Sequence, residues 1–367
     1  LHLSRAESVL AGTKRNPFRI RMRTGCDAEG RLVAQEVEAL ADSGAYASLS
    51  PGVLETAMEH AAGPYRVANI RTRGRLAYTN NGTGGAFRGF GANQMSYAIE
   101  CQIDRLAARC GLDPVEIRRR NLRRAGEPGF LGQKVAPTEK LSEMLDIAAA
   151  SDLWAPAAAR PDEVTGTGIA LNYQGNGLGT IPTDEARFEV RLEDGKIRVF
   201  TGLDEIGQGM VASVHAAVAE RLHCARADIE VIFGDTGTAP DSGSTTASRG
   251  GYVVWRGVEE TAPALAAKIL AQASLRLGLP ADRLRIVPGG VQAEGGNHSP
   301  TLAFSELAPE RAETFFAFPK SDYRAGNARF IFAYGVTLAR VAISRVCGAD
   351  EAAATEIYTA AGKVIDM

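Results

Sequence analysis

Three glycine-rich segments, each directly before a sequence that predicts a helix, are the parts of this chain best suited to chemistry. The first loop is Gly84–Gly91, the second loop is Glu205–Gly209 and the third loop is Ser242–Gly251. The first turn of a helix has N–H groups without intrahelical partners and carries the positive end of the helix dipole. Glycine lets a ligand approach the backbone closely, so such loops bind phosphates and other anions. A single loop of this kind is more typical of a tight helix cap, but three together favour a large, polar, anionic cofactor.

The loops do not match the common nucleotide-binding motifs. The chain has no Gly-x4-Gly-Lys-Ser/Thr segment, and Gly175–Gly179 does not open a clear helix as a dinucleotide-binding loop would. The sequence also shows no His and Cys residues at metal-ligand spacing. Cys101 and Cys110 are nine positions apart inside a predicted helix, which is not the spacing of an iron–sulfur cluster.

The first half of the chain predicts strands followed by helices. Apolar residues at every second position of 18–22 predict a strand, Asp27–Gly30 predicts a turn, and Leu32–Leu40 predicts a second strand. Beyond the first loop, the apolar stripe over 95–110 predicts a helix that Gly111 ends.

A second helix is expected directly after this one. Asp113 is a good N-cap and Pro114 suits the first helical position, so we expect a helix to about Arg124. The arginines at 118–120 and 123–124 are interpreted as a solvated helix face or a subunit contact rather than a nucleic-acid-binding surface.

The second half predicts a similar mixture. Its expected elements are a hairpin of strands at 188–192 and 197–199, a helix over 209–223, a strand at 229–233, a helix from about 251 to 278 that is kinked at Pro263, and a strand at 335–343. Helices mixed with hairpins, without strict strand–helix alternation, predict an α+β fold of two mixed α/β domains. The Ala- and Pro-rich stretch 154–166 places the boundary, giving domains 1–153 and 154–367.

Composition narrows the class of protein. The 367 residues are 45% hydrophobic and 23% charged with a net charge of −2, which is typical of a globular chain and gives no overall field for nucleic acid or an anionic membrane. No apolar run is long enough to span a bilayer. Five cysteines are too few for a disulfide framework and favour a cytoplasmic protein.

The motifs carry a resemblance to a known family. Ala86–Gly91, Glu205–Gly209 and Thr246–Arg249, in this order, resemble the molybdenum-binding catalytic subunit of the xanthine dehydrogenase / aldehyde oxidase family. Cys110–Arg118 and Gly234–Thr236 are similar to segments that lie between those motifs in the family. The likeness runs over essentially the whole chain.

The resemblance implies a molybdenum-pterin cofactor, either molybdopterin or its cytosine dinucleotide, in two mixed α/β domains like the family's molybdopterin-binding domains. By motif match, the backbone at Arg88 and Ala247 lies near the molybdenum without ligating it through a side chain, and Phe90 packs on a flat substrate. The implied cofactor-binding positions are Phe87, Arg88, Gly89, Gly207, Gln208, Gly209, Ala247 and Ser248. Iron–sulfur centres and FAD are expected on other domains or subunits, in a homo-oligomeric parent protein.

The same resemblance implies an enzyme that hydroxylates N-heterocycles or aldehydes with water-derived oxygen. The family's general base, a glutamate near the subunit's C-terminus, is expected beyond Met367, so no catalytic residue is assigned. We expect an internal fragment that is inactive alone, and a non-catalytic folding unit or scaffold is the alternative. Glu205 is interpreted as a loop residue rather than a base. Thr56 stands where xanthine-oxidising members have an arginine that faces the purine.

Overall fold

The computed structural model describes residues 3–156, 163–181, 183–296 and 299–344. Its chain forms two compact units, of which the first comprises Leu1–Thr180 with Lys320–Met367 and the second comprises Ile181–Pro319. The expected boundary stretch 154–166 lies partly outside the described residues. Compact units and sequence-defined domains need not coincide, so the division into 1–153 and 154–367 stays a prediction.

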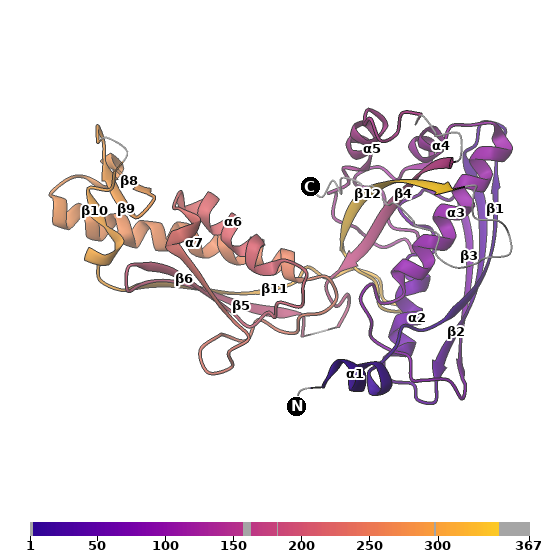
Figure 1. Ribbon diagram of the computed structural model, residues 1–367, viewed down its shortest axis with the longest axis horizontal. Helices are drawn as coiled ribbons and strands as arrows, with labels where there is room; N and C mark the ends of the chain where they lie inside the picture. Colours follow the sequence, from indigo (N-terminus) through magenta and orange to yellow (C-terminus); the bar gives the residue numbers. More distant parts are fainter. Residues whose placement is uncertain (1–2, 157–162, 182, 297–298, 345–367) are drawn as a thin grey trace. The chain divides into compact units, whose positions relative to one another are not determined.

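The first unit is built on a three-stranded sheet and a long two-stranded ribbon (Figure 1). Its elements are α1 (Arg5–Ala11), β1 (Phe18–Cys26), β2 (Leu32–Gly44), α2 (Ser50–Glu59), β3 (Asn69–Tyr78), α3 (Ala92–Cys110), α4 (Pro114–Asn121), α5 (Leu141–Ala149), β4 (Glu163–Asn176) and β12 (Ile331–Ser344). The predicted strands at 18–22 and 32–40 are confirmed and pair antiparallel as β1 and β2. The sequence did not predict β3, which lies parallel to β2 after the crossover through α2.

Helices α2 and α3 cover one face of the β1–β2–β3 sheet because apolar side chains alternate along its strands. Val37 and Ala39 of β2 are buried with Ala57 of α2 and Met95 of α3. The predicted helix ending at Gly111 is confirmed, since Gly111 adopts the left-handed conformation with φ 64°. Packing of the apolar face of α3 on the sheet therefore fixes the position of this helix and of the first loop, which directly precedes it.

The helix expected over 114–124 is three residues shorter. Asp113 accepts hydrogen bonds from the N–H groups of Val115 and Glu116, as expected of an N-cap, but Leu122 leaves the helix with ψ 136°. Arg123 N–H then donates to the carbonyl of Pro64 at 3.0 Å. This tertiary bond replaces the last helical turn.

The second unit is a four-stranded sheet in the order β11-β5-β6-β7, with a small three-stranded sheet beside it. Its elements are β5 (Glu185–Glu193), β6 (Lys196–Thr201), α6 (Met210–Leu222), β7 (Ile229–Phe233), α7 (Gly250–Leu277), β8 (Leu284–Val287), β9 (Gly290–Ala293), β10 (Leu302–Ala303) and β11 (Glu310–Ala317), with short 3-10 turns at 226–228, 281–283 and 304–306. The predicted hairpin is confirmed as β5 and β6, the strand at 229–233 as β7, and the helices as α6 and α7. Helix α7 continues through Pro263.

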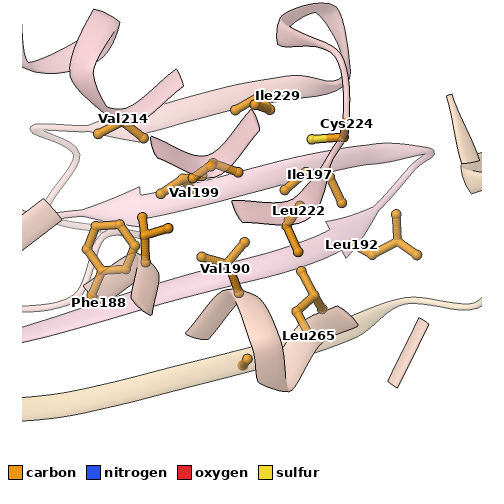
Figure 2. Packing of buried hydrophobic residues seen from close by; sticks show 14 of the residues in the cluster. Phe188, Val190, Leu192, Ile197, Val199, Val214, Leu222, Cys224, Ile229 and Leu265 are labelled. Atoms are coloured by element: carbon orange, nitrogen blue, oxygen red, sulfur yellow. The ribbon is translucent and has the colours of Figure 1, made fainter. Parts of the chain in front are cut away.

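The core of the second unit lies between its four-stranded sheet and the helices α6 and α7. Figure 2 shows Phe188 and Val199 of the sheet among Val214 and Leu222 of α6 and Leu265 of α7. Gly257 permits this packing, because a Cβ there would collide with the ring of Phe188. The contact brings α7 close to β5 and so places the first turn of α7 against the rest of the unit.

The open edge of β4 is held by two buried polar side chains, one from α3 and one from His60, which directly follows α2. Glu100 of α3 accepts from the N–H of Leu171 at 2.8 Å, and Nε2 of His60 accepts from the N–H of Gly175 at 3.0 Å. The backbone groups of an edge strand need such partners when they are buried. These bonds join the β4–β12 ribbon to the rest of the first unit.

His60 gives the fold a pH dependence. Its ring is fully buried, Nδ1 donates to the carbonyl of Thr56 at 2.7 Å, and Nε2 is an acceptor, so the neutral form fits. Burial, with a smaller effect of Arg329, lowers the pKa of His60 from 6.5 to about 4. The unfolded chain therefore binds a proton between these values while the folded chain does not, and stability falls as the pH drops from about 7 to about 4.

We expect the free energy of unfolding to lose up to about 3 kcal/mol over this range through His60. Urea unfolding at pH 7, 5 and 4 measures it by comparing the wild-type chain with His60→Gln. His223→Asn, a change at an exposed histidine, is the control. An equally steep acid loss in His60→Gln and in the wild type would contradict the assignment.

No helix among the described residues is both long enough and apolar enough to cross a lipid bilayer.

Candidate cofactor site

The first loop is a left-handed turn that packs on α2. Gly89, Phe90 and Gly91 have φ values of 96°, 46° and 94°, and the N–H of Phe90 donates to the carbonyl of Phe87 at 2.8 Å. Glycine is required at 91, because a Cβ there would collide with the main-chain oxygen of Val53. The loop therefore reaches the N-terminus of α3 in one fixed path along α2.

The two expected substrate residues are both located at α2: Thr56 belongs to this helix, and Phe90 packs against it. The ring of Phe90 lies against Gly52, where an added Cβ would be 3.4 Å from the ring. Thr56 is one turn further along α2, on the side that also contains Gly52. Its side chain is buried, with 2% exposed.

Residues 14–16, which the sequence analysis did not single out, also hold the first loop. The N–H of Gly85 donates to the carbonyl of Lys14 at 3.1 Å, and Asn16 donates to Ser50 Oγ at 2.8 Å. Ser50 Oγ in turn donates to the carbonyl of Gly84 at 3.1 Å. The only sequence signal was a cluster of polar residues just before a strand, which is too common to indicate a site.

Arg15 reaches further into the first loop. Its guanidinium donates to the carbonyl of Arg88 at 2.7 Å and to Oδ1 of Asn93 at 2.9 Å, and it lies over the ring of Phe87 with 4.6 Å to the centroid. The side chain of Arg88 is exposed. The main chain at 88 is thus fixed while its own side chain is not.

The second loop is closed by its own carboxylate. Glu205 accepts hydrogen bonds from the N–H groups of Gly207 at 2.8 Å, Gly209 at 3.1 Å and Val211 at 3.2 Å. These bonds lower the pKa of Glu205, so the group is ionised and engaged, which makes it a poor general base. The structure thus agrees with the interpretation of Glu205 as a loop residue.

Gln208 is also turned toward its own loop. Its Oε1 accepts from the N–H of Ile206 at 2.7 Å, and its Nε2 donates to the carbonyl of Asp204 at 2.8 Å. Added Cβ atoms at Gly207 and Gly209 would meet only open space. The loop therefore leaves room on its outer side for a ligand to approach its backbone.

The third loop has a strained backbone just before α7. Ala247 and Ser248 both have φ 52°, a conformation that residues other than glycine adopt rarely. Helix α7 has no side-chain cap, so the N–H groups of its first turn are not covered by a side chain of the loop. In contrast to α6, the N-terminus of α7 is open to an anion.

Arg249 holds this strained backbone in place. Its side chain is 1% exposed and pairs with Asp184, with 2.9 Å between Nε and Oδ1. The terminal nitrogens donate to the carbonyls of Ser242 at 2.6 Å, Ser244 at 3.2 Å and Glu185 at 2.6 Å. One guanidinium therefore ties both ends of the third loop to the start of β5.

The second and third loops lie side by side. The N–H of Asp204 donates to Thr245 Oγ1 at 2.8 Å, and the N–H of Gly202 donates to Ser242 Oγ at 2.8 Å. Two loops about 40 residues apart thus form one surface at the N-terminal ends of the packed helices α6 and α7 (Figure 1).

The expected site residues fall into two groups. The first unit holds Thr56, Phe87, Arg88, Gly89 and Phe90, and the second holds Gly207, Gln208, Gly209, Ala247 and Ser248. Each group is brought together by its own unit. Among the described residues, no group of three or more His, Cys, Asp or Glu side chains could hold a metal ion.

The second unit suits an anionic pterin in one respect and opposes it in another. The open first turn of α7 and the space beside Gly207 and Gly209 fit a phosphate-bearing group. The carboxylate of Glu205 already occupies the N-terminus of α6, so an anion there would meet like charge. The joint surface of the second and third loops therefore fits an anionic pterin at the N-terminus of α7 and the third loop, and not at the N-terminus of α6.

Comparison with known proteins identifies two domain matches along the chain. Residues 1–122 match one molybdopterin cofactor-binding domain model, and residues 140–367 match a second one. The chain is 38% identical over 371 aligned positions to a probable xanthine dehydrogenase subunit from Bacillus subtilis, covering all of this chain and 50% of that protein. It is also 42% identical over 143 residues to the large molybdopterin subunit of nicotinate dehydrogenase from Eubacterium barkeri, covering 39% of this chain and 34% of that subunit.

Solved structures of molybdenum hydroxylases have a similar fold. The aldehyde oxidoreductase of Desulfovibrio desulfuricans superposes with a TM-score of 0.66 at 25% identity, covering 90% of this chain and 35% of that one. Quinoline 2-oxidoreductase from Pseudomonas putida superposes with a TM-score of 0.69 at 22% identity, covering 94% of this chain and 47% of that one, which shows a shared fold. The predicted fold of two mixed α/β molybdopterin-binding domains is confirmed.

The chain spans about half the length of the Bacillus subtilis relative and about a third of the length of the Eubacterium barkeri subunit. Two molybdopterin cofactor-binding domain models together match most of the chain. The glycine-rich loops of this chain stand directly before helices α3, α6 and α7. The chain belongs to the molybdopterin cofactor-binding family of xanthine dehydrogenase and aldehyde oxidoreductase molybdenum subunits.

Proposed function

We propose that this chain supplies part of the molybdenum-pterin site of a hydroxylase that oxidises N-heterocycles, including xanthine- or hypoxanthine-like purines, or aldehydes with oxygen derived from water. The observation that carries the proposal is the joint surface of the second and third loops at the open N-terminus of α7. Anionic cofactors are bound at such helix ends. The matches to molybdopterin cofactor-binding domains along both halves of the chain support the same group.

In this proposal the chain acts mainly through its backbone. By motif match, Phe87–Gly89, Gly207–Gly209, Ala247 and Ser248 would bind the cofactor, and the main chain at Arg88 and at Ala247 would be near the molybdenum. When bound, the cofactor supplies the redox centre of the hydroxylation. The buried Arg249 and the packed residues 14–16 keep these backbone segments from moving, and rigid placement lowers the ordering cost of binding.

Two residues of the chain decide substrate class in this proposal. The ring of Phe90 would stack on a flat substrate, and the buried Thr56 stands where xanthine-oxidising members have a guanidinium. A hydroxyl cannot replace a guanidinium as a partner for negative charge. We therefore propose a substrate less anionic than xanthine, such as another N-heterocycle or an aldehyde.

The partners and setting belong to the same proposal. Electrons leave through iron–sulfur and FAD domains or subunits of a homo-oligomeric parent protein. Relatives named as single subunits support separate companion chains. The free thiols of Cys26, Cys101, Cys110 and Cys224 support a cytoplasmic setting.

Cofactor content tests the proposal. We expect a chimera, in which this chain replaces the matched half of the Bacillus subtilis relative, to hold about one molybdenum and one pterin per chain when it is produced in a host that makes the cofactor. The 367-residue chain by itself should hold far less, because it covers only about half of the Bacillus subtilis relative. Elemental analysis and pterin fluorescence measure both.

Phe90→Ala in the chimera separates substrate from cofactor roles. Its molybdenum content should stay unchanged, while aromatic substrates should bind about 1–3 kcal/mol more weakly through lost stacking and burial. A well-folded chimera without molybdenum would contradict the proposed hydroxylase function and favour a non-catalytic folding unit or scaffold. A content of about one molybdenum per isolated 367-residue chain would contradict the expectation that this chain is inactive by itself.

A further inference from the structure

We propose that Arg15 is a positioning residue of the candidate site, which fixes the first loop by binding its main chain at Arg88. Its place in a working site rests on the proposed function. Arg15 stands outside all three glycine-rich motifs, about 70 residues before the loop that it contacts.

One guanidinium makes two contacts with the loop and a third with the first turn of α3. Nη2 donates to the carbonyl of Arg88 at 2.7 Å, Nη1 donates to Oδ1 of Asn93 at 2.9 Å, and the planar group lies over the ring of Phe87. A planar fork can serve two acceptors and one ring face at the same time, which the ammonium group of lysine cannot. Arg15 therefore joins the middle of the loop to the first turn of α3.

The first loop needs such an outside contact. Its backbone is left-handed at 89–91, and it has two short-range hydrogen bonds of its own, from Phe90 N–H to the carbonyl of Phe87 and from Ala92 N–H to the carbonyl of Gly89. Among the residues that the structure describes, the carbonyl of Arg88 accepts from Arg15 alone. Without that donor, the segment between Gly85 and Gly91 would lose the hydrogen bond that fixes its middle residue, Arg88.

The contact also changes the chemistry of the loop. A cationic donor on the carbonyl of Arg88 polarises the peptide group that joins Arg88 to Gly89, and hydrogen bonds in series strengthen one another. The N–H of Gly89 thereby becomes a better donor toward an oxygen ligand. Arg15 thus acts on the site through the peptide group, without touching a ligand itself.

Amide hydrogen exchange in the 367-residue chain tests this directly. In Arg15→Met we expect the amides of Phe90 and Ala92 to exchange at least tenfold faster than in the wild type, while the amides of β2 and the middle of α3 stay unchanged. Arg15→Lys keeps the charge and should restore part of the protection. Arg19→Met, at an exposed arginine on the adjoining strand, is the matched control and should change nothing in the loop.

A second variant keeps the test decisive where Arg15→Met does not fold. Asn93→Ala removes one of the two acceptors and should raise exchange in the loop by a few-fold, a smaller factor than in Arg15→Met. Unchanged exchange at Phe90 and Ala92 in Arg15→Met, or in Asn93→Ala when only that variant folds, overturns the proposal.

The functional half has its own readout. In the chimera described above, Arg15→Met should lower kcat at least tenfold with a smaller rise in KM, because the loop main chain is loosened and the same loop carries Phe90. A change in KM alone would overturn the positioning role. If the wild-type chimera holds no molybdenum, the proposed function fails, and the exchange experiment still decides whether Arg15 fixes the loop.

Discussion

Arg249→Met should destabilise the second unit by about 3–5 kcal/mol, the range for breaking a buried ion pair by removing one partner. The change leaves the carboxylate of Asp184 buried without its guanidinium and removes the donor from three main-chain carbonyls. Methionine fills much of the volume but offers no hydrogen bond. Urea unfolding, followed by tryptophan fluorescence in a Trp154→Phe background so that Trp255 on α7 reports alone, measures the loss.

The matched control is Arg276→Met, at an exposed arginine in the last turn of the same helix. It should change the free energy of unfolding by less than about 0.5 kcal/mol. Equal stability of the two variants would show that the Arg249–Asp184 pair does not hold the third loop. Asp184→Asn offers a second route, because it keeps the shape and removes the charge.

Arg118→Met should destabilise the first unit by a similar amount, about 3–5 kcal/mol. The Arg118 side chain is fully buried, with Nε 2.9 Å from Oε2 of Glu100 and Nη1 2.8 Å from Oδ1 of Asp104. Glu100 also accepts from the hydroxyl of Tyr65 and the N–H of Leu171, so its carboxylate joins α3 to the edge of β4. Removing Arg118 leaves that carboxylate buried beside neutral donors only.

The pH dependence of this loss has a definite sign. Burial raises the pKa of Glu100, and the charge of Arg118 opposes that rise. Without Arg118 the folded-state pKa rises further above the unfolded value, so the variant is least destabilised below about pH 4.5 and loses stability as the pH increases. Urea unfolding at pH 5 and pH 8 should therefore show the larger deficit at pH 8. Arg105→Met, at an exposed arginine on α3, is the control, and a deficit independent of pH would contradict the role of Glu100.

Arg118 also shows where sequence reasoning failed. The run of arginines at 118–120 and 123–124 favours a solvated helix face or a subunit contact, but Arg118 is fully buried and Arg123 is 8% exposed. Arg123 pairs with Glu139 at 2.7 Å. Burial of an arginine depends on a carboxylate from another element, and neither Glu100 nor Glu139 is near enough in sequence to reveal that pairing.

Parallel strands escaped sequence analysis for a similar reason. The hairpin of β5 and β6 was predictable, because its turn and its alternating pattern lie within a few residues. The pairing of β2 with β3 and of β6 with β7 crosses a helix in each case, so the partner strand is distant in sequence. Alternation identifies a strand but not its neighbour.

The sequence by itself determined the helices that follow the three loops, the hairpin, the fold class and the family, because periodicity, glycine positions and contiguous motifs are local properties of a chain. Tertiary structure alone decided that the second and third loops share one surface, that Glu205 closes α6 while α7 stays open, and that Arg15 and Arg249 hold the loops from outside the glycine positions. Each of these depends on hydrogen bonds to main-chain groups distant in sequence or on the direction of a side chain. No residue type or spacing encodes such bonds, since any arginine or glutamate could make them and only the packed chain selects which one does.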